Sequence, residues 1–475
     1  MSTGAIFLAS ALKILFIVLV VIGAFAPLLV WVDRRQSAMI QDRVGPHRAG
    51  FTLPKDVVKG IAALVNPLRF GTRGALALAL ACLFGLVVLG LSGSGDLAGA
   101  TPKDLYRYAL AMTVFAGLLF LGRWVHEGLV NAGGKITLFG VLHPAADAMK
   151  MIWKEDFVPA RADKLLHALA PVITLIPAIA SFAVIPFADV LYLEYWNQVL
   201  PVAADGAAQA VALVGDAVPM QVASLNVGIL FIFAVAGTGV IGAAIGGYAS
   251  DNKFSLMGGM RAASQMVSYE VALGLTIVPC FMMYGSLRLE EMALWQAQNA
   301  WGIFLPPLTL AFLLYFTAAT AETKRVPFDV PEGESELVGG YLTEYSGLKF
   351  GIFFTGEYVE MVAFSALAAV LFFGGWDVPW LYANGFDLPG TWAYTVPLTD
   401  WVISDKIAVT HWVVIALQVG STLFKVIAFL FLQMMIRWSL PRFRYDQIMS
   451  LCWKGVLPLA LVNILLTGIL ILLFD

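Results

Sequence analysis

Long apolar stretches alternate with shorter polar ones along the whole 475-residue chain. A helix that crosses a bilayer needs about 20 mostly apolar residues, within a range of roughly 17–25. Ten stretches meet this requirement, and the third of them is the shortest. They cover residues 11–32, 75–94, 107–123, 165–188, 224–247, 268–286, 303–321, 349–375, 409–436 and 454–473. The pattern predicts an all-α, polytopic membrane protein with ten transmembrane helices, forming a single integral membrane domain.

The composition agrees with a chain that lies mostly in a membrane. Hydrophobic residues make up 60% of it and charged residues 13%, whereas a soluble domain is typically about 25% charged. A net charge of −3 gives no reason to expect nucleic-acid binding. Cys82, Cys280 and Cys452 form no cluster-binding pattern, and the five histidines form no haem-binding pattern. We therefore expect this chain to bind no metal and no cofactor of its own.

The distribution of basic residues predicts the orientation. The alternate loops 33–73, 123–164, 248–266, 322–349 and 437–454 carry 23 of the 29 lysines and arginines. Basic residues concentrate in cytoplasmic loops, so these loops are expected on the cytoplasmic side and both termini on the periplasmic side. The first stretch lacks the basic start of a signal peptide, and we interpret it as a retained span.

Four ionisable residues lie within or beside apolar stretches: Glu270, Glu357, Glu360 and Lys425. A charge at the bilayer centre costs at least ~2.5 kcal/mol, so such residues usually face a polar interior. Glu357 and Glu360 are three positions apart and share one helix face. Two nearby carboxylates raise each other's pKa, which makes them candidate proton carriers. The alternative is a helix-end residue that reaches water or a static ion pair, and for Lys425 this structural role is favoured.

Segment 321–336 reads AETKRVPFDVPEGESE and, with Glu344 shortly after it, holds six acids against two basic residues. Pro327 and Pro331 prevent a regular helix through it. It lies between two apolar spans and interleaves apolar residues with the acids. Irregular backbone is tolerated at membrane depth where it lines a water-filled cavity, so the segment is a candidate cavity and proton path. A solvated surface loop is the alternative.

Two further features follow the first span. The run from Asp33 to Gly50 combines basic residues with Gly45-Pro46, which suggests a shaped turn as well as positive-inside anchoring. Segment 136–153 is apolar on one side and carries Asp147 and Lys150 on the other. It predicts an amphipathic helix, either in the cytoplasmic membrane interface or packed on a neighbour.

At these residues the sequence resembles the H subunit of bacterial respiratory complex I, called subunit 1 in mitochondria. The matching stretches are QDRVGPHRAG (41–50), LHPAADAMKMIWKED (142–156), SDNKFSLMGGMRAASQMVSYEVALGL (250–275), AETKRVPFDVPEGESELVGGYLTEYSGLKFGIFFTGEY (321–358) and LPRFRYDQIMSLCWK (440–454). They occur in the family's order, and with the intervening spans they cover nearly the whole chain except about 51–135.

The resemblance implies an all-helical core of eight spans with an interfacial helix after the first. The chain then divides into residues 1–50, with the first span and the turn, an inserted segment 51–135 with a two-helix hairpin, and residues 136–475. The chain departs from the family at His143, usually Gln, and at Lys324, usually Asn. Span 224–247 carries no acid, although some members have a glutamate there, so the charged path through this span is not shared by all members.

The resemblance also implies the site residues. Arg34, Arg43, Asp147 and Phe328 match positions lining or bordering a chamber for quinone. The residues matching the family's charged path, which leads away from that chamber, are Glu270, Glu322, Asp329, Glu332, Glu334, Glu336, Glu344 and Glu357. No catalytic residue is expected in this chain.

The implied activity is that of a subunit of a proton-translocating NADH:quinone oxidoreductase in the respiratory chain of a bacterial plasma (inner) membrane. Quinone is the expected substrate, and flavin and iron–sulfur clusters are expected in partner subunits of the peripheral arm. Other membrane-arm subunits are expected partners. An alternative is the homologous subunit of a membrane-bound hydrogenase or formate hydrogenlyase complex. A stand-alone transporter is disfavoured because no inverted repeat is visible, and a purely structural scaffold leaves Glu270 and Glu357 unexplained.

Overall fold

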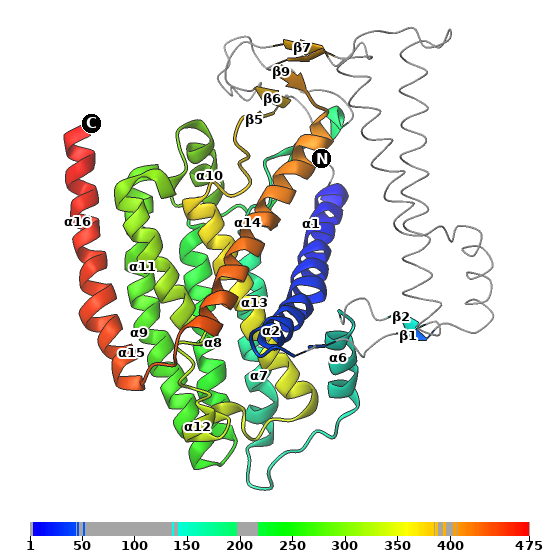
Figure 1. Ribbon diagram of the computed structural model, residues 1–475, viewed down its shortest axis with the longest axis vertical. Coiled ribbons are helices and arrows are strands. Elements are labelled where there is room, and N and C mark those ends of the chain that lie inside the picture. The colour runs from blue at the N-terminus through cyan, green and yellow to red at the C-terminus, as the bar shows by residue number, and fades with distance from the viewer. Residues whose placement is uncertain are drawn as a thin grey trace. The chain divides into compact units, whose positions relative to one another are not determined.

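The apolar stretches of the sequence form long helices that run side by side in a computed structural model of the chain (Figure 1). The structure describes residues 3–43, 45–46, 51–52, 135–136, 141–196, 217–383, 385–387, 393–395, 402–404 and 406–474. Two compact units are distinguished. The larger comprises residues 1–41, 144–385 and 408–475, and the smaller comprises residues 42–143 and 386–407.

The helices have the following bounds. In chain order they are α1 (Thr3–Ile17), η1 (Val18–Phe25), α2 (Ala26–Ile40), α6 (His143–Trp153), α7 (Lys164–Ala180), η5 (Ser181–Ala183), η6 (Leu193–Tyr195), α8 (Gly228–Ala249), α9 (Lys253–Tyr284), α10 (Leu289–Gln298), η7 (Gly302–Phe304), α11 (Pro306–Glu322), α12 (Glu334–Leu337), η8 (Gly340–Leu342), α13 (Gly347–Phe372), α14 (His411–Ser439), α15 (Tyr445–Leu451), η9 (Cys452–Val456) and α16 (Leu457–Phe474). Segments α1, η1 and α2 follow without a break, and η1 is a wider π-helical stretch within them.

Among the described residues, seven helical runs are long and apolar enough to cross a membrane. They are Leu8–Ile40, Lys164–Ala183, Gly228–Ala249, Lys253–Tyr284, Gly347–Phe372, His411–Ser439 and Tyr445–Leu473. Each overlaps one of the predicted spans. The predicted span 303–321 coincides with α11, whose 17 residues reach the lower limit for crossing. The predicted spans 75–94 and 107–123 lie outside the described residues. The chain is thus all-α and polytopic in its described part.

Helix α9 is longer than the predicted span 268–286, because it begins at Lys253. The Asn252 side chain caps it by accepting a hydrogen bond from the Phe254 N–H at 2.9 Å. The added turns carry polar residues, and these face protein rather than lipid, as Gln265 and Ser255 are buried. Hydropathy alone therefore places the start of this helix too late.

Helix α13 is the centre of the bundle. Of its most apolar 18-residue window 89% is buried, against 22–50% for the other six runs. It packs against α7, α11 and α14. A polar residue on α13 is therefore surrounded by protein rather than by lipid.

Helix α6 is amphipathic, as expected for segment 136–153, although it begins only at His143. Pro144 is its buried residue, whereas Met149, Ile152 and Trp153 are exposed. An uncovered apolar side on a short helix favours the interfacial interpretation over packing on a neighbour.

The strands are short, with two or three residues each. Their bounds are β1 (Phe51–Thr52), β2 (Lys135–Ile136), β3 (Leu191–Tyr192), β4 (Ala217–Val218), β5 (Leu381–Tyr382), β6 (Gly385–Asp387), β7 (Ala393–Thr395), β8 (Val402–Ser404) and β9 (Lys406–Ala408). Antiparallel pairs join β1 to β2, with Phe51 opposite Ile136, and β3 to β4, with Leu191 opposite Val218. A third such pair joins β7 to β8.

Candidate functional site

The acidic segment singled out in the sequence belongs to the loop of residues 323–346, which joins α11 to α13. Its prolines prevent a regular helix, and only the four-residue α12 and the three-residue η8 interrupt its irregular course. A side chain of α9 holds its first part in place. The Gln265 amide donates hydrogen bonds to the carbonyl oxygens of Ala321 (2.8 Å) and Phe328 (2.9 Å).

The loop also rests directly on the backbone of α9. A methyl group added at Gly258 would lie 2.6 Å from the Cα of Gly340, which is closer than carbon atoms approach. Gly340 has φ +55°, a conformation that favours glycine. Two glycines therefore allow the loop and the helix to approach at backbone distance.

The centre of the site is a buried group of three side chains from the loop and α13. Arg325 Nη2 lies 3.3 Å from Glu357 Oε2, an ion pair without the alignment of a hydrogen bond. The Tyr341 hydroxyl donates a hydrogen bond of 2.6 Å to Glu357 Oε1. All three residues are at most 9% exposed. A carboxylate buried in this way is held by one cation and one neutral donor, which is the pairing that buried charges require.

Aromatic rings on α13 support the cation from its other side. The Arg325 guanidinium carbon lies 4.3 Å from the Tyr358 ring centroid and 5.5 Å from that of Phe354. A planar guanidinium stacks on such rings while its N–H groups reach a carboxylate. Lys324, the departure from the family's usual Asn, lies 5.6 Å from the Tyr341 ring centroid.

Burial and like charges shift the protonation of the acids in the loop. Burial, followed by the neighbouring charges of Glu357 and Asp329, raises the pKa of Glu332 well above its ordinary value. Burial also raises the pKa of Asp329 to about 6, although Arg442 acts in the opposite direction. Burial and Glu357 together raise the pKa of the Tyr341 hydroxyl. Tyr341 therefore remains a donor, while Glu332 and Asp329 become protonated at a higher pH than exposed carboxyls do.

Several buried polar atoms of this loop and of the helix end before it have no hydrogen-bond partner among the residues that the structure describes. They are Glu322 Oε2, Lys324 Nζ, Arg325 Nε, Asp329 Oδ1 and Glu332 Oε1. Buried polar groups in proteins are nearly always hydrogen-bonded, to protein or to ordered water. Their concentration in one loop therefore indicates a site that accommodates water.

A second set of acids leads from the loop into the bundle. Glu322, the last residue of α11, is 2% exposed. It interacts electrostatically with Glu360 on α13 and Glu270 on α9. The Glu270 carboxylate packs against Gly237 of α8, where an added methyl group would lie 2.6 Å from its Oε1. Four helices thus bring together acids that are far apart in the sequence.

Two arginines at the end of α14 and just beyond it complete the network. Arg442 donates to Asp329 at 2.8 Å, and Arg437 donates to Asp33 of α2 at 2.8 Å. These pairs join the loop and the end of α2 to one segment of the chain. The sequence assigned both arginines only to positive-inside anchoring.

Of the four residues expected at a chamber, Arg34, Asp147 and Phe328 lie in the larger unit, where Phe328 has other partners than the Arg34–Asp147 pair. Arg34 Nη1 and Asp147 Oδ2 form an ion pair of 2.5 Å, with side chains 47% and 31% exposed. Phe328 is buried between the rings of Tyr269 (5.8 Å) and Phe443 (5.6 Å). Arg43 follows α2 and belongs to the smaller unit.

The remaining acids of the loop have different surroundings. Glu336 pairs with Arg261 of α9 at 2.7 Å and is 59% exposed. Glu344 accepts a hydrogen bond of 2.6 Å from the Asn252 side chain. Glu334 is the first residue of α12. Glu336 and Glu344 therefore bind the loop to the ends of helices rather than join its buried centre.

Some functional candidates carried no signal in the sequence. Gln265 and Tyr341 are neutral, so a search for misplaced charges passes over them, although Tyr341 stands within a family motif. Lys425, expected as a static counter-charge, instead donates from its ammonium to the carbonyl oxygens of Gly375 (2.9 Å) and Asp377 (2.6 Å). It binds carbonyl oxygens beyond the end of α13.

Within the described residues, no group of three or more His, Cys, Asp or Glu side chains could hold a metal ion. The fold and the site define a polytopic helical membrane protein with a charged loop packed against its central helix. A comparison with known protein families narrows this class to one family. Residues 131–468 match the family described as NADH dehydrogenase, and the chain belongs to it.

Three relatives with similar sequences are named as H subunits of NADH-quinone oxidoreductase. The H subunit numbered 1 in Geobacter metallireducens is 40% identical over 80% of this chain and 98% of its own length. The one numbered 1 in Cytophaga hutchinsonii is 40% identical over 71% of this chain and 85% of its own. The one numbered 2 in Geobacter sulfurreducens is 39% identical over 78% of this chain and 96% of its own.

Proposed function

We propose that this chain is a membrane subunit of a proton-translocating NADH:quinone oxidoreductase in a bacterial plasma membrane. The loop of residues 323–346 carries the proposal, because it combines irregular backbone, a buried ion pair and unpartnered polar atoms beside the central helix. Irregular backbone at membrane depth occurs where it lines a water-filled cavity. The chain is inactive alone, since electrons reach quinone from flavin and iron–sulfur clusters held by partner subunits.

In this proposal Arg34, Arg43, Asp147 and Phe328 border the quinone chamber. The Arg34–Asp147 pair is half exposed, so a polar headgroup can reach it and be oriented by it. Phe328, 4% exposed, supports the loop from behind through its ring contacts. An apolar lining with a few placed polar groups is the usual form of such a site.

The charged path begins in the loop with the acids Asp329, Glu332, Glu334, Glu336 and Glu344. It continues through Glu357 and Glu322 to Glu270. Reduction of a quinone by two electrons gives a dianion, which takes up two protons to form the quinol. The negative charge favours protonation of nearby acids, and the shift biases the loop between two arrangements. The raised pKa of Glu332 and that of Asp329, about 6, support this, because both acids take up a proton at a higher pH than an exposed carboxyl does.

We also propose that segment 51–135 is an insertion with two further spans and that both termini lie on the periplasmic side. The pairing of Phe51 with Ile136 supports the insertion. Paired strands bring both ends of the segment to the same side of the membrane, as an even number of crossings requires. The excess of basic residues in alternate loops supports the orientation.

The test is purification of the assembly through a tag on this chain, in mild detergent. NADH-dependent quinone reduction that a quinone-site inhibitor abolishes, with flavin and iron–sulfur subunits present, is expected. A hydrogenase or formate-oxidising partner set without NADH activity would overturn the proposal.

The coupling role is tested in the same assembly after reconstitution into vesicles. Glu357→Gln should lower the number of protons moved per quinone reduced. Glu155→Gln is the control, because Glu155 is exposed between α6 and α7. Full pumping in Glu357→Gln would remove this residue from the path.

A further inference from the structure

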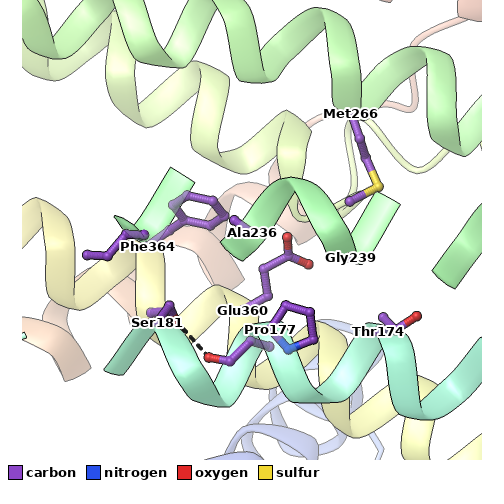
Figure 2. A pocket seen from close by; sticks show the side chains of 11 residues that line it. Thr174, Pro177, Ser181, Ala236, Gly239, Met266, Glu360 and Phe364 are labelled. Atoms are coloured by element: carbon purple, nitrogen blue, oxygen red, sulfur yellow. Dashed lines mark hydrogen bonds between the residues drawn. The ribbon is translucent and has the colours of Figure 1, made fainter. Parts of the chain in front are cut away.

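A small cavity lies inside the bundle, one helical turn along α13 from Glu357. It has a volume of about 20 Å³ and is lined by residues of α7, η5, α8, α9 and α13. Its lining residues include Thr174, Ser181, Gly239, Met266 and Glu360. Figure 2 shows the Glu360 side chain at the centre of this group, between α7 and the residues Gly239 and Met266.

The cavity has the size and polarity to hold one water molecule. A water needs at least about 10–15 Å³ of such volume and two to four polar partners. The Glu360 carboxylate is one partner. The Ser181 hydroxyl donates to Ala178 O at 2.7 Å, which leaves its oxygen as an acceptor. The carboxylate and this hydroxyl oxygen therefore supply two partners.

The α8 wall of the cavity is a glycine. A methyl group added at Gly239 would meet no atom within 4 Å, so the open space begins at its Cα. On the α9 wall, Met266 lies four residues before Glu270, on the same helix face. Glu270 thus lies one turn from the cavity.

The charges acting on Glu360 come from three directions. Lys324 and Arg325 of the loop are cations, Glu357 is on its own helix, and Glu270 is on α9. Glu322 of α11 interacts with it electrostatically as well. Glu360 therefore interacts with both the acid at the end of α11 and the acid on α9, and with charges of both signs.

We propose that Glu360, through a water in this cavity, carries protons between Glu322 and Glu270. This rests on the proposed function. One proton leaves the Glu322 carboxyl and binds the Glu360 carboxylate, and Glu360 then releases it through the water to the Glu270 carboxylate. Only O–H bonds break and form, and the net charge of the group is unchanged. The route passes α8 at a glycine, in the span that carries no acid of its own.

The test uses the assembled complex in vesicles and measures protons moved per NADH oxidised, together with the rate of quinone reduction. For Glu360→Gln we expect coupled turnover to fall on the order of tenfold, less than the ~10²-fold or more for removal of a direct general acid or base. Glu360→Asp should restore part of it. Loss of a carboxylic-acid band in infrared difference spectra of Glu360→Gln would identify the group that changes protonation.

A second variant leaves Glu360 unchanged and removes the water. Gly239→Ala places a methyl group in the cavity and should lower coupled turnover severalfold. Gly420→Ala is the matched control, since Gly420 is an exposed helical glycine in α14 where an added methyl group also meets no atom within 4 Å. It should behave as the parent protein does.

The outcomes separate the two proposals. Normal pumping in both Glu360→Gln and Gly239→Ala, with loss of pumping in Glu357→Gln, would overturn the role of Glu360 and keep the charged path. Normal pumping in all three would overturn the path as well. Equal loss in Gly239→Ala and Gly420→Ala would assign the effect to packing and reject the water.

Discussion

The Tyr341 hydroxyl donates a hydrogen bond of 2.6 Å to Glu357, and this bond ties the loop of residues 323–346 to the central helix. Both side chains are at most 2% exposed, so neither partner exchanges with bulk water. Arg325 acts on the other carboxylate oxygen. The position of the loop and the charge of Glu357 are therefore linked, because protonation of that carboxylate weakens both contacts.

Removal of the hydroxyl tests this link. In Tyr341→Phe a buried acceptor loses its donor, which costs about 1–3 kcal/mol. We expect the loop to open more often, seen as faster limited proteolysis within residues 323–346, and slower quinone reduction in membranes. Tyr382→Phe is the control, since Tyr382 is 46% exposed. Unchanged proteolysis and rate in Tyr341→Phe would show that the bond does not hold the loop.

The pairing of Asp329 with Arg442 predicts a pH dependence. The pKa of Asp329 is raised to about 6 by burial, so its carboxylate predominates above that pH and is protonated as the pH falls through it. Protonation removes the charge that Arg442 binds at 2.8 Å. We expect the rate of quinone reduction to fall on the acid side of about pH 6.

Asp329→Asn should flatten this acid limb and give a low rate at all pH values, because the amide resembles the protonated acid. Glu336→Gln should keep the limb, since Glu336 is exposed and its pair with Arg261 contributes little. If the acid limb persists unchanged in Asp329→Asn, a group other than Asp329 is responsible for it.

The exposed pair of Arg34 and Asp147 predicts an effect on binding rather than on folding. Exposed ion pairs contribute about 0–1 kcal/mol to stability, so Arg34→Ala should assemble normally. We expect the KM for quinone to rise severalfold with kcat retained. Exchange of the two charges in Arg34→Asp with Asp147→Arg should restore part of the affinity, and the exposed Lys150→Ala is the control. An unchanged KM would place the headgroup elsewhere.

The sequence predicted the helices well where contact with lipid makes most residues of a span apolar. Runs such as 411–439 are mostly apolar and were found by length and hydropathy. The first turns of α9 were missed for the opposite reason. Residues such as Gln265 face the polar loop inside the protein, so the helix there lacks the apolar signal of a span.

The charged residues of the site were found because charge is conspicuous in an apolar chain. Their partners were not, because pairing depends on the fold. Arg437 and Asp33 are 404 positions apart, and nothing in their local sequence connects them. Likewise the cavity beside Glu360 arises where four helices meet, and its open wall is a glycine that no pattern distinguishes from the other glycines of its helix.

The pairing of Phe51 with Ile136 has a consequence for the history of the chain. Directly opposed residues of antiparallel strands lie about 5 Å apart, so the polypeptide returns from segment 53–134 almost to the point where it left. The chain before Phe51 and after Ile136 can follow the same course whether the segment between them is long or is a short turn. A passage of this length can thus be acquired or lost in one genetic event, without compensating change in the helices on either side.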